Sequence, residues 1–363
     1  MSKKVKALIV VGGTGGHVFP GINLASALIK KNYSVKIVTD KRGYKFFKDT
    51  DKKNVLVFPS SPLIKKNIVL SIFSLSLILY SILKSLLFLI YNRPNIIFGM
   101  GGYASFPICI AAAILRIKFV IYENNLIIGR ANKKLLPFAE KILVSNKKLE
   151  GISSKYNSKT IEVGNIIKKE IINFSLDFRI KKKELKILVL GGSQAAKTFA
   201  EILPKIFKKC SDIGISIKII QHCLPHQNSE LSSFYKKSNI EHELFNFSDN
   251  LIQFFSKVNL AITRSGSSVL AELTNANIPF ISIPLPSSAD DHQLKNATFY
   301  KNKNFSFLVE EKDLNDKLLN LLKEIYENMS KLDEISANQR QYSDKHVYEN
   351  IHKVLDKILN EKN

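Results

Sequence analysis

Three glycine-rich segments of this sequence are suited to holding phosphate groups. They are residues 12–17 (GGTGGH), 99–105 (GMGGYAS) and 191–198 (GGSQAAKT). Glycine lets the main chain approach a ligand closely, and N–H groups at the start of a helix attract anions. We therefore expect three anion-binding turns, with Ser193 and the amides after it contacting a diphosphate.

Two side chains near such turns could do chemistry. The His17 imidazole follows the first glycine turn and could accept a proton near neutral pH, although it could equally cap a helix. Glu272 follows the segment 264–271 (RSGSSVLA) and could bind the vicinal diol of a ribose, or merely complement a helix dipole. The loop 284–297 is stiffened by proline and ends in polar groups suited to sugar hydroxyls.

Several other chemistries are disfavoured. Residues 12–17 lack the GxGxxG spacing of a dinucleotide site, where Asp40 would be the candidate ribose ligand. Residues 191–198 have Ala196 where a Walker A loop requires glycine. Of the seven histidines, His222 and His226 stand alone, so we expect no metal site and no cofactor. Three scattered cysteines predict a reducing compartment, which suggests the cytoplasm.

The charge of the chain is unevenly distributed. Its 363 residues, 45% hydrophobic and 23% charged, are enough for two globular domains and too apolar for a disordered chain. Residues 1–165 hold 26 Lys+Arg and 7 Asp+Glu, a net charge of +19. Residues 166–363 hold 28 Lys+Arg and 24 Asp+Glu, a net charge of +4, so the whole chain carries +23. This excess of positive charge predicts a polyanionic partner: nucleic acid, an anionic membrane or a phosphorylated substrate.

The elements that must position these residues follow a repeated order. A short apolar run, a glycine turn and an amphipathic stretch occur twice, which is the opening of a βαβ unit. We expect helices at 20–31, 68–91 and 196–209, and strands at 5–11, 35–38, 55–58, 96–98, 119–122, 142–144, 185–190, 216–220, 260–262 and 280–283. The alternation predicts an α/β fold with two Rossmann-like domains built on parallel sheets.

The predicted domains divide the chain into three parts. We expect residues 1–165 to form an N-terminal domain and residues 166–345 to form a second domain. Residues 346–363 form a helix that packs back on the first domain. We expect the linker at 173–183 and the ligand cleft between the domains, where the carboxyl ends of both sheets face each other.

The longest apolar stretch, 68–91, is interrupted by Lys84 and carries serines at helical spacing along one side. We interpret it as a helix partly packed on its own domain and partly exposed, rather than as a membrane span. Lys65, Lys66, Lys84 and Arg93 bracket it, which is typical of a surface that binds anionic lipid. An ordinary buried helix is the alternative.

Six segments in this order and spacing resemble the MurG family, within glycosyltransferase family 28. They are 12–21 (GGTGGHVFPG), 99–103 (GMGGY), 123–132 (ENNLIIGRAN), 163–165 (VGN), 191–194 (GGSQ) and 264–272 (RSGSSVLAE), and the similarity covers residues 5–300. The family transfers GlcNAc from UDP-GlcNAc to undecaprenyl-pyrophosphoryl-MurNAc-pentapeptide, converting lipid I to lipid II in peptidoglycan synthesis. The resemblance implies a GT-B fold and a metal-independent, inverting hexosyltransferase, peripheral on the cytoplasmic face of the cell membrane.

The resemblance also implies that residues 1–165 bind the acceptor and the membrane and that residues 166–345 bind UDP-GlcNAc, and it implies site residues. His17 matches the family's proposed general base or acceptor-site histidine. The UDP-GlcNAc residues would be Thr14, Gly15, Gly16, Asn125, Lys168, Ser193, Ser248, Ser267, Ser268, Val269, Leu270, Ala271, Glu272 and Gln293. We further expect the pyrophosphate of the undecaprenyl-linked acceptor at Gly13, Gly101, Gly102 and Tyr103, on the glycine segments 12–17 and 99–105.

The sequence departs from the family pattern at several positions. Lys168 replaces the usual arginine and cannot form a bidentate fork on a diphosphate. Ser248 replaces isoleucine, Ile166 a proline, Ala195 a glycine, Tyr122 a histidine and His292 a glutamine. None of these changes removes a proposed catalytic group.

Two other functions remain open from sequence. A UDP-GlcNAc 2-epimerase-like enzyme of the same fold would need neither an acceptor nor a membrane. A nucleic-acid-binding protein would account for the charge, but we find no nucleic-acid-binding motif and expect no such partner.

Overall fold

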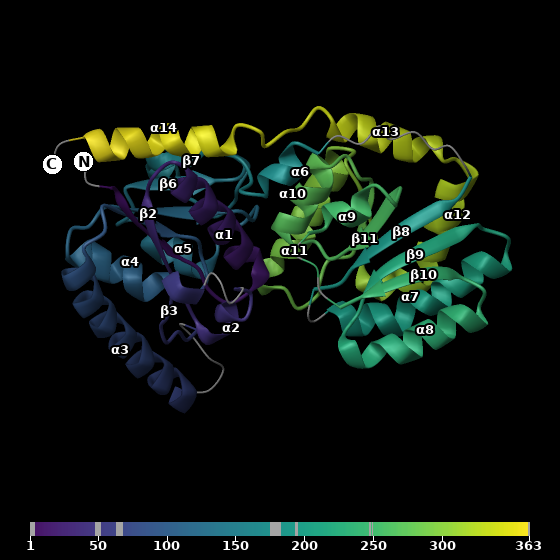
Figure 1. The fold of residues 1–363 in the computed structure, drawn as a ribbon, viewed down its shortest axis with the longest axis horizontal. Coiled ribbons are helices and arrows are strands. Elements are labelled where there is room, and N and C mark those ends of the chain that lie inside the picture. Colours follow the sequence, from purple (N-terminus) through teal and green to yellow (C-terminus); the bar gives the residue numbers. More distant parts are fainter. Residues whose placement is uncertain are drawn as a thin grey trace. The chain divides into compact units, whose positions relative to one another are not determined.

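The computed structural model describes residues 4–47, 52–62, 68–174, 183–192, 195–246, 248 and 250–361. The chain divides into two compact units, each an α/β unit with one sheet (Figure 1). Unit 1 comprises residues 1–167 and 344–363, and unit 2 comprises residues 168–343. The expected linker, 173–183, falls largely on 175–182, which lie outside the described residues.

Unit 1 is built on a seven-stranded sheet of order β3-β2-β1-β4-β5-β6-β7, and every described pairing is parallel. Its strands are β1 (Lys6–Val10), β2 (Ser34–Thr39), β3 (Val55–Val57), β4 (Ile96–Gly99), β5 (Phe119–Glu123), β6 (Lys141–Val144) and β7 (Thr160–Glu162). Its helices are α1 (Gly15–Lys30), α2 (Lys41–Tyr44), α3 (Ile68–Asn92), α4 (Ser105–Ile114), α5 (Arg130–Leu135) and α14 (Val347–Asn360).

Unit 2 repeats this plan with six parallel strands in the order β10-β9-β8-β11-β12-β13. Its strands are β8 (Leu185–Leu190), β9 (Ile217–His222), β10 (Glu241–Phe245), β11 (Leu260–Thr263), β12 (Phe280–Ser282) and β13 (Phe307–Leu308). Its helices are α6 (Lys169–Ile172), α7 (Ala195–Asp212), α8 (Asn228–Lys237), α9 (Ile252–Phe255), α10 (Ser267–Asn275), α11 (His292–Asn302), α12 (Leu319–Glu327) and α13 (Ser330–Gln339). The predicted pair of parallel α/β sheets is confirmed.

Each sheet is buried on both faces, which explains why its central strands are continuous apolar runs. In β1, Leu8 and Val10 join a core cluster with α3 and α4, while Ile9 between them is also fully buried. The three strands absent from the predicted set, β7, β10 and β13, all lie at sheet edges. Their side chains are at most partly buried, so they lack that signature.

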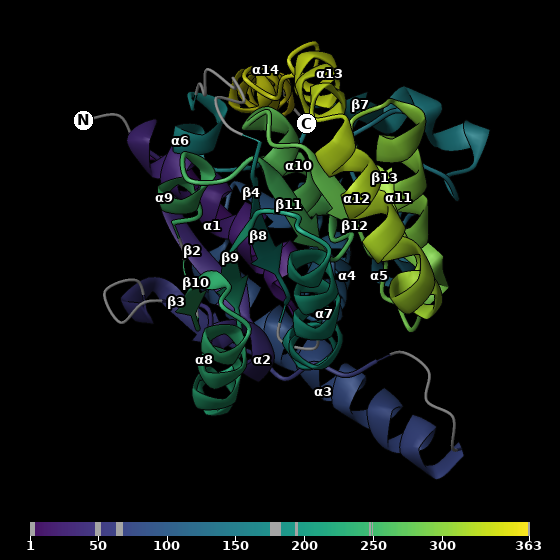
Figure 2. The ribbon, with the colours of Figure 1, turned by 90° about the vertical axis from the view of Figure 1, so that its right-hand side faces the viewer.

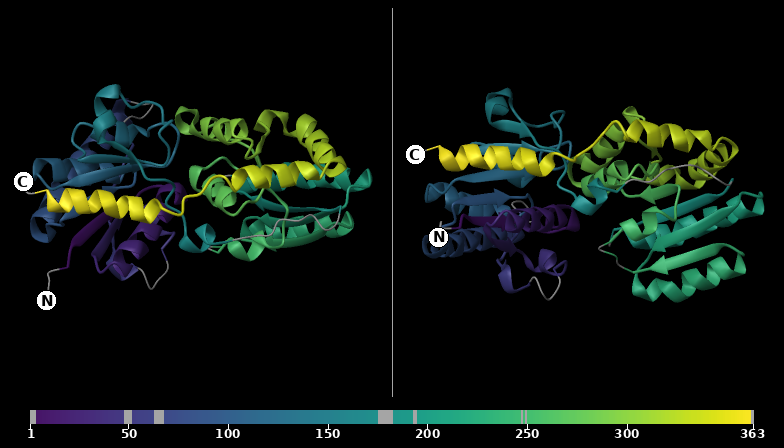
Figure 3. Two further views of the ribbon diagram at one scale, coloured as in Figure 1. Left: turned by 90° about the horizontal axis from the view of Figure 1, so that it is seen from above. Right: turned by 45° about the horizontal axis from the view of Figure 1, so that its top comes forward.

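The carboxyl-terminal helix α14 belongs to unit 1, along which it runs in Figures 1 and 3. The Lys118 ammonium donates to the carbonyls of Ile358 and Glu361, both at 2.9 Å, at the end of the helix where a cation is favoured. At the other end the Tyr348 hydroxyl donates to the Ile167 carbonyl over 2.6 Å. The helix therefore fixes the stretch of chain that leaves unit 1.

Helix α3 turns its serines inward and its large apolar side chains outward. Ser74, Ser81 and Ser85 are at most 2% exposed. The outward side chains, Ile72, Leu75, Leu79, Leu83, Leu87 and Ile90, are 54–66% exposed. Leu86, on the same helix, packs partly on the core. The helix packs along α4 (Figure 2), and so one side is held by unit 1 while the other is an apolar surface.

By length and composition alone, residues 72–92 of α3 could cross a membrane. The core helix of a soluble protein passes the same test, so the interpretation against a span, which depended on Lys84 and the serines, stays a prediction. The packing of α3 on its own unit does agree with the expected half-packed helix. Lys84 sets its ammonium 4.6 Å from the ring centre of Phe58, while Lys65 and Lys66 lie outside the described residues.

Candidate active site

The glycine turns of unit 1 gather at the carboxyl edge of its sheet. Residues 12–17 follow β1, residues 100–104 follow β4 and residues 124–129 follow β5, and these three strands are neighbours. The carboxyl ends of parallel strands meet at one edge, which is where ligands bind in such sheets. The predicted phosphate turns at 12–17 and 99–105 are thereby adjacent.

These turns touch at positions where a side chain would not fit. A Cβ on Gly12 would lie 2.8 Å from the Cβ of Ala104, and one on Gly102 would lie 2.8 Å from the Gly12 carbonyl oxygen. Gly13, Gly101 and Gly102 also have φ between +76° and +88°, which glycine adopts at no steric cost. The two loops form one continuous main-chain surface because they carry no side chains there.

Helix α1 begins earlier than the sequence predicts. It starts at Gly15 rather than at Pro20, with Thr14 as the N-cap residue, so that His17 lies in its first turn. Pro20 then sits inside the helix and has no N–H for the carbonyl of residue 16. The Asn124 amide donates to that Gly16 carbonyl instead, over 2.9 Å, and thereby ties the loop after β5 to the start of α1.

His17 packs against the loop after β4. A Cβ built on Gly101 would lie 2.9 Å from Cε1 and 3.0 Å from Nδ1 of its ring. The imidazole is therefore at the junction of the two glycine turns, partly accessible, where it could accept a proton from a ligand bound on them.

A buried carboxylate organises the third loop. Glu123 is 1% exposed and accepts from the Asn125 main chain and amide, at 3.1 and 3.0 Å. Its other oxygen accepts from Gly129 N at 2.9 Å and from Asn132 Nδ2 at 3.0 Å. Glu123 thus positions Asn125, a predicted donor ligand. The motif contained this residue, but its spacing did not indicate a role for it.

Two departures from the family pattern compensate each other. The Tyr122 hydroxyl donates to the Gly164 carbonyl at 3.1 Å and accepts from Ile166 N at 3.0 Å. A proline at position 166 would offer no N–H for that contact. Burial, together with nearby Asp344 and Glu123, raises the pKa of Tyr122, so the hydroxyl stays protonated.

In unit 2, the predicted residues gather around the start of α10. Ser267, Ser268 and Val269 form its first turn after Gly266, and Glu272 follows one turn later. Leu270 and Ala271 are fully buried in the core of the unit, so their side chains do not line a site.

Glu272 and Lys168 interact within unit 2. Burial raises the pKa of Glu272 to about 7, and the nearby charge of Lys168 opposes this effect. Lys168 is the N-cap residue of the short helix α6, which packs against α10. The carboxyl group therefore changes charge near neutral pH, which is a frequent property of functional sites.

Gln293 joins the loops that follow β11 and β12. Its side-chain oxygen accepts from Ser265 N at 3.2 Å and from Leu285 N at 3.0 Å. Arg264 makes a parallel connection, since it pairs with Glu311 and donates to the carbonyls of 283 and 284 at 3.4 Å. Both side chains hold the loops around α10 in place.

The remaining predicted residues are less informative. Ser248 is partly exposed, and its hydroxyl oxygen accepts from Asn250 N at 3.1 Å and from Gln253 Nε2 at 2.8 Å. Ser193 lies outside the described residues. Asp40, the candidate ribose ligand of a dinucleotide site, instead caps α2 and pairs with Arg42. Among the described residues, no group of three or more His, Cys, Asp or Glu could hold a metal ion.

The contact between Gly101 and His17 gives a testable expectation. Gly101→Ala combines the strain of φ +88° with overlap against the imidazole, whereas Gly214→Ala has a similar φ of +83° and no atom within 4 Å. We expect Gly214→Ala to lower the free energy of unfolding of its unit by about 1 kcal/mol and Gly101→Ala to lower that of unit 1 by about 2–3 kcal/mol. Urea unfolding measures both, and equal losses would contradict the contact.

Comparison with solved structures places this arrangement among GT-B enzymes. A crystal structure of Acinetobacter baumannii MurG superposes with a TM-score of 0.76 at 22% identity, covering 98% of this chain and 100% of that one. A putative UDP-N-acetylglucosamine 2-epimerase from Listeria monocytogenes gives 0.65 at 13% identity, covering 99% and 98%. At these identities the likeness establishes the fold.

Sequence comparison is more specific. Residues 7–144 match the glycosyltransferase family 28 N-terminal domain, and residues 186–354 match the C-terminal domain. Relatives named UDP-N-acetylglucosamine--N-acetylmuramyl-(pentapeptide) pyrophosphoryl-undecaprenol N-acetylglucosamine transferase come from Pelagibacter ubique and Rickettsia bellii. The Pelagibacter ubique protein is 32% identical to this chain, and the match covers 99% of this chain and 100% of the relative. The Rickettsia bellii protein is 33% identical, and the match covers 92% of this chain and 94% of the relative. The chain belongs to glycosyltransferase family 28, and within it to the family of these transferases.

Proposed function

We propose that the chain transfers GlcNAc from UDP-GlcNAc to the 4-hydroxyl of undecaprenyl-pyrophosphoryl-MurNAc-pentapeptide, forming lipid II for peptidoglycan synthesis and thereby serving cell shape and division. The observation that carries the proposal is the placement of His17 against Gly101, at the edge where two glycine turns meet. Near-full-length identity to relatives named for this reaction supports it.

His17 is the proposed general base. It takes the proton of the acceptor 4-hydroxyl as that oxygen forms a bond to the anomeric carbon of GlcNAc. The bond from this carbon to the β-phosphate oxygen breaks, and UDP leaves with the electron pair. Attack from the face opposite UDP inverts the anomeric centre and yields a β-linkage.

Unit 2 holds the nucleotide in this proposal. The start of α10 offers main-chain N–H groups, and Glu272 accepts from the ribose hydroxyls. Lys168, Ser193 and the amides near it bind the diphosphate and stabilise the charge that grows on departing UDP. Donor contacts of Thr14, Gly15, Gly16 and Asn125 come from unit 1, as the family resemblance implies. These cationic and amide groups would let the reaction proceed without a divalent ion.

UDP release tests the function directly. We expect release from UDP-GlcNAc that requires a lipid-linked MurNAc-pentapeptide acceptor and persists in EDTA. His17→Ala should lower kcat at least a hundredfold, because general base catalysis contributes about 10²–10⁴. His226→Ala, in unit 2, is the matched control and should leave the rate unchanged. Release without an acceptor would favour an epimerase-like enzyme, and loss of release in EDTA would contradict the metal-free mechanism.

The proposed ribose contact predicts a pH dependence of donor binding. Because the pKa of Glu272 is raised to about 7, its carboxylate is present above that pH and is protonated as the pH falls below it. A protonated carboxyl accepts from the ribose less well, so UDP-GlcNAc affinity should fall about tenfold from pH 8.5 to 5.5. Calorimetry should show weak, pH-independent binding for Glu272→Gln and the full dependence for the exposed control Glu334→Gln. A full dependence in both would exclude this role.

We also propose that unit 1 binds the anionic cytoplasmic surface of the cell membrane through the outward side of α3. Fully burying one large aliphatic side chain contributes about 1.5–3 kcal/mol, and six such side chains lie on this side at 54–66% exposure. The +19 balance of residues 1–165 adds attraction to anionic lipid. The packing of α3 along α4 and the hydrogen bond from Ser81 to the Pro59 carbonyl hold the helix against the rest of unit 1. We therefore propose that α3 lies on the membrane surface and does not cross the bilayer.

Vesicle binding tests this surface. The double variant Leu79→Glu, Leu83→Glu should weaken binding to phosphatidylglycerol vesicles at least tenfold, since it places charge on the apolar side. Ile213→Glu, at an apolar residue 55% exposed in unit 2, is the matched control and should bind as the wild type does. Equal weakening by both variants, or none by the first, would contradict the assignment.

A further inference from the structure

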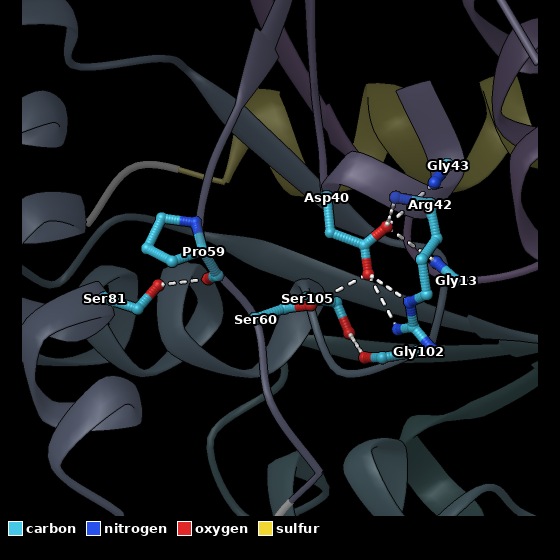
Figure 4. A network of polar contacts seen from close by, with 9 residues as sticks. All are labelled: Gly13, Asp40, Arg42, Gly43, Pro59, Ser60, Ser81, Gly102 and Ser105. Atoms are coloured by element: carbon cyan, nitrogen blue, oxygen red, sulfur yellow. Dashed lines mark hydrogen bonds and ion pairs between the residues drawn. The ribbon is translucent and has the colours of Figure 1, made fainter. Parts of the chain in front are cut away.

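A buried carboxylate in unit 1 aims an arginine at the first glycine turn (Figure 4). Asp40, at the end of β2, has a side chain only 4% exposed, whereas that of Arg42 is 55% exposed. The guanidinium donates to one carboxylate oxygen from Nη2 at 2.7 Å and from Nε at 3.2 Å. Two of the five guanidinium N–H groups are thus directed at Asp40, and the other three are directed elsewhere.

Asp40 has other donors besides this guanidinium. It accepts from the main-chain N–H of Gly43 at 2.8 Å, Arg42 at 3.1 Å and Gly13 at 3.3 Å, and from the Ser60 hydroxyl at 2.8 Å. Burial opposes its ionisation, yet these hydrogen bonds and the Arg42 charge hold the pKa of Asp40 below its usual value. The carboxylate therefore stays charged at neutral pH and fixes the direction of the Arg42 side chain.

The guanidinium lies over the main chain of the glycine turn. A Cβ on Gly13 would be 3.4 Å from Nη2 and 3.7 Å from Cζ of Arg42. The Tyr103 ring, from the loop after β4, has its centre 6.0 Å from Cζ. Arg42 is therefore placed beside both turns that the sequence assigns to a pyrophosphate. Because α2 follows β2 rather than a glycine motif, nothing in the sequence pattern singled it out.

The same network reaches the apolar helix. Ser60 donates to Asp40, and the carbonyl of Pro59, one residue earlier, accepts from Ser81 of α3 at 2.9 Å (Figure 4). Ser61 donates to Ser74, also of α3, at 3.0 Å. The residues 59–61 thus fix the lipid-facing helix and Arg42 in one hydrogen-bonded frame. If α3 lies on a bilayer, the Arg42 guanidinium is therefore held at a fixed position relative to the phosphate groups of a lipid in that bilayer.

We propose that Arg42, oriented by Asp40, binds the diphosphate of the lipid-linked acceptor on the surface formed by residues 12–13 and 101–102. This inference rests on the proposed function, which supplies a prenyl diphosphate as ligand. A guanidinium can bind phosphate oxygens through two parallel hydrogen bonds, which the glycine amides alone do not provide. Arg42 is a binding residue of the acceptor, and Asp40 is its positioning residue.

The test compares the effect of each substitution on the KM for the acceptor with its effect on the KM for UDP-GlcNAc. The probe is a short-chain, water-soluble prenyl-pyrophosphoryl MurNAc-pentapeptide, which removes membrane binding from the measurement. We expect Arg42→Ala to raise the KM for this acceptor about 10- to 100-fold, the range expected for lost charge-assisted hydrogen bonds, and to change the KM for UDP-GlcNAc less than twofold. Arg42→Lys, which keeps the charge but not the fork, should raise it less.

Lys41→Ala is the matched control, because it removes the same charge from the adjacent exposed position of α2. It should leave both KM values unchanged. Inorganic pyrophosphate should compete with the acceptor in the wild type and in Lys41→Ala, and much more weakly in Arg42→Ala and Arg42→Lys.

The outcomes separate the two proposals. A wild type without acceptor-dependent UDP release would overturn the proposed function. A wild type that turns over, with an unchanged acceptor KM in Arg42→Ala, would overturn only this inference, as would a rise confined to the UDP-GlcNAc KM or an equal rise in Lys41→Ala. If circular dichroism shows that Arg42→Ala does not fold, the test uses Arg42→Lys instead. An acceptor KM and a pyrophosphate competition equal to those of the wild type would then overturn the inference.

Discussion

The close contact of two glycine loops is the constraint on which unit 1 depends. Adjacent strands β1 and β4 end in turns that touch main chain to main chain, and a single methyl group on Gly12 or Gly102 would come within 2.8 Å of the opposite turn. The contact sets the start of α1, and with it His17, against the loop after β4. Because the residues at the contact are glycines, main-chain peptide groups form the surface there, and such groups are suited to binding anions.

The polar network behind this surface explains why α3 buries its serines. A helix that faced its apolar side inward would pack well, but it would offer no hydroxyl to the carbonyl of Pro59 or to Ser61. The inverted arrangement leaves large aliphatic side chains in water, which is unfavourable unless another apolar phase covers them. One helix thus couples an exposed apolar surface to the loops that carry the site.

The candidate site was only partly predictable. The glycine segments and His17 are visible because glycine spacing is a local property of the chain. The roles of Asp40 and Arg42 are not visible, since they depend on Gly13 and Tyr103, which the sheet brings from distant parts of the sequence. The Glu123 carboxylate has partners only two to nine positions along the chain, but its spacing did not indicate a role for it. Edge strands such as β10 were missed for a related reason, because half-exposed strands lack a continuous apolar run.

The sequence by itself determined the class of the protein: two parallel α/β units, glycine turns after their strands, and a basic first half with one long apolar helix. These are properties of spacing and composition, which hydrophobic burial and backbone sterics translate directly into elements. Tertiary structure alone decided which side of α3 faces outward, how Asn124 replaces the hydrogen bond that Pro20 cannot make, and where Asp40 directs Arg42. Those outcomes depend on hydrogen bonds that join separate segments of the chain, namely Asn124 with Gly16, Ser81 with Pro59, and Gly13 with Asp40, and these exist only after the sheet has aligned its strands.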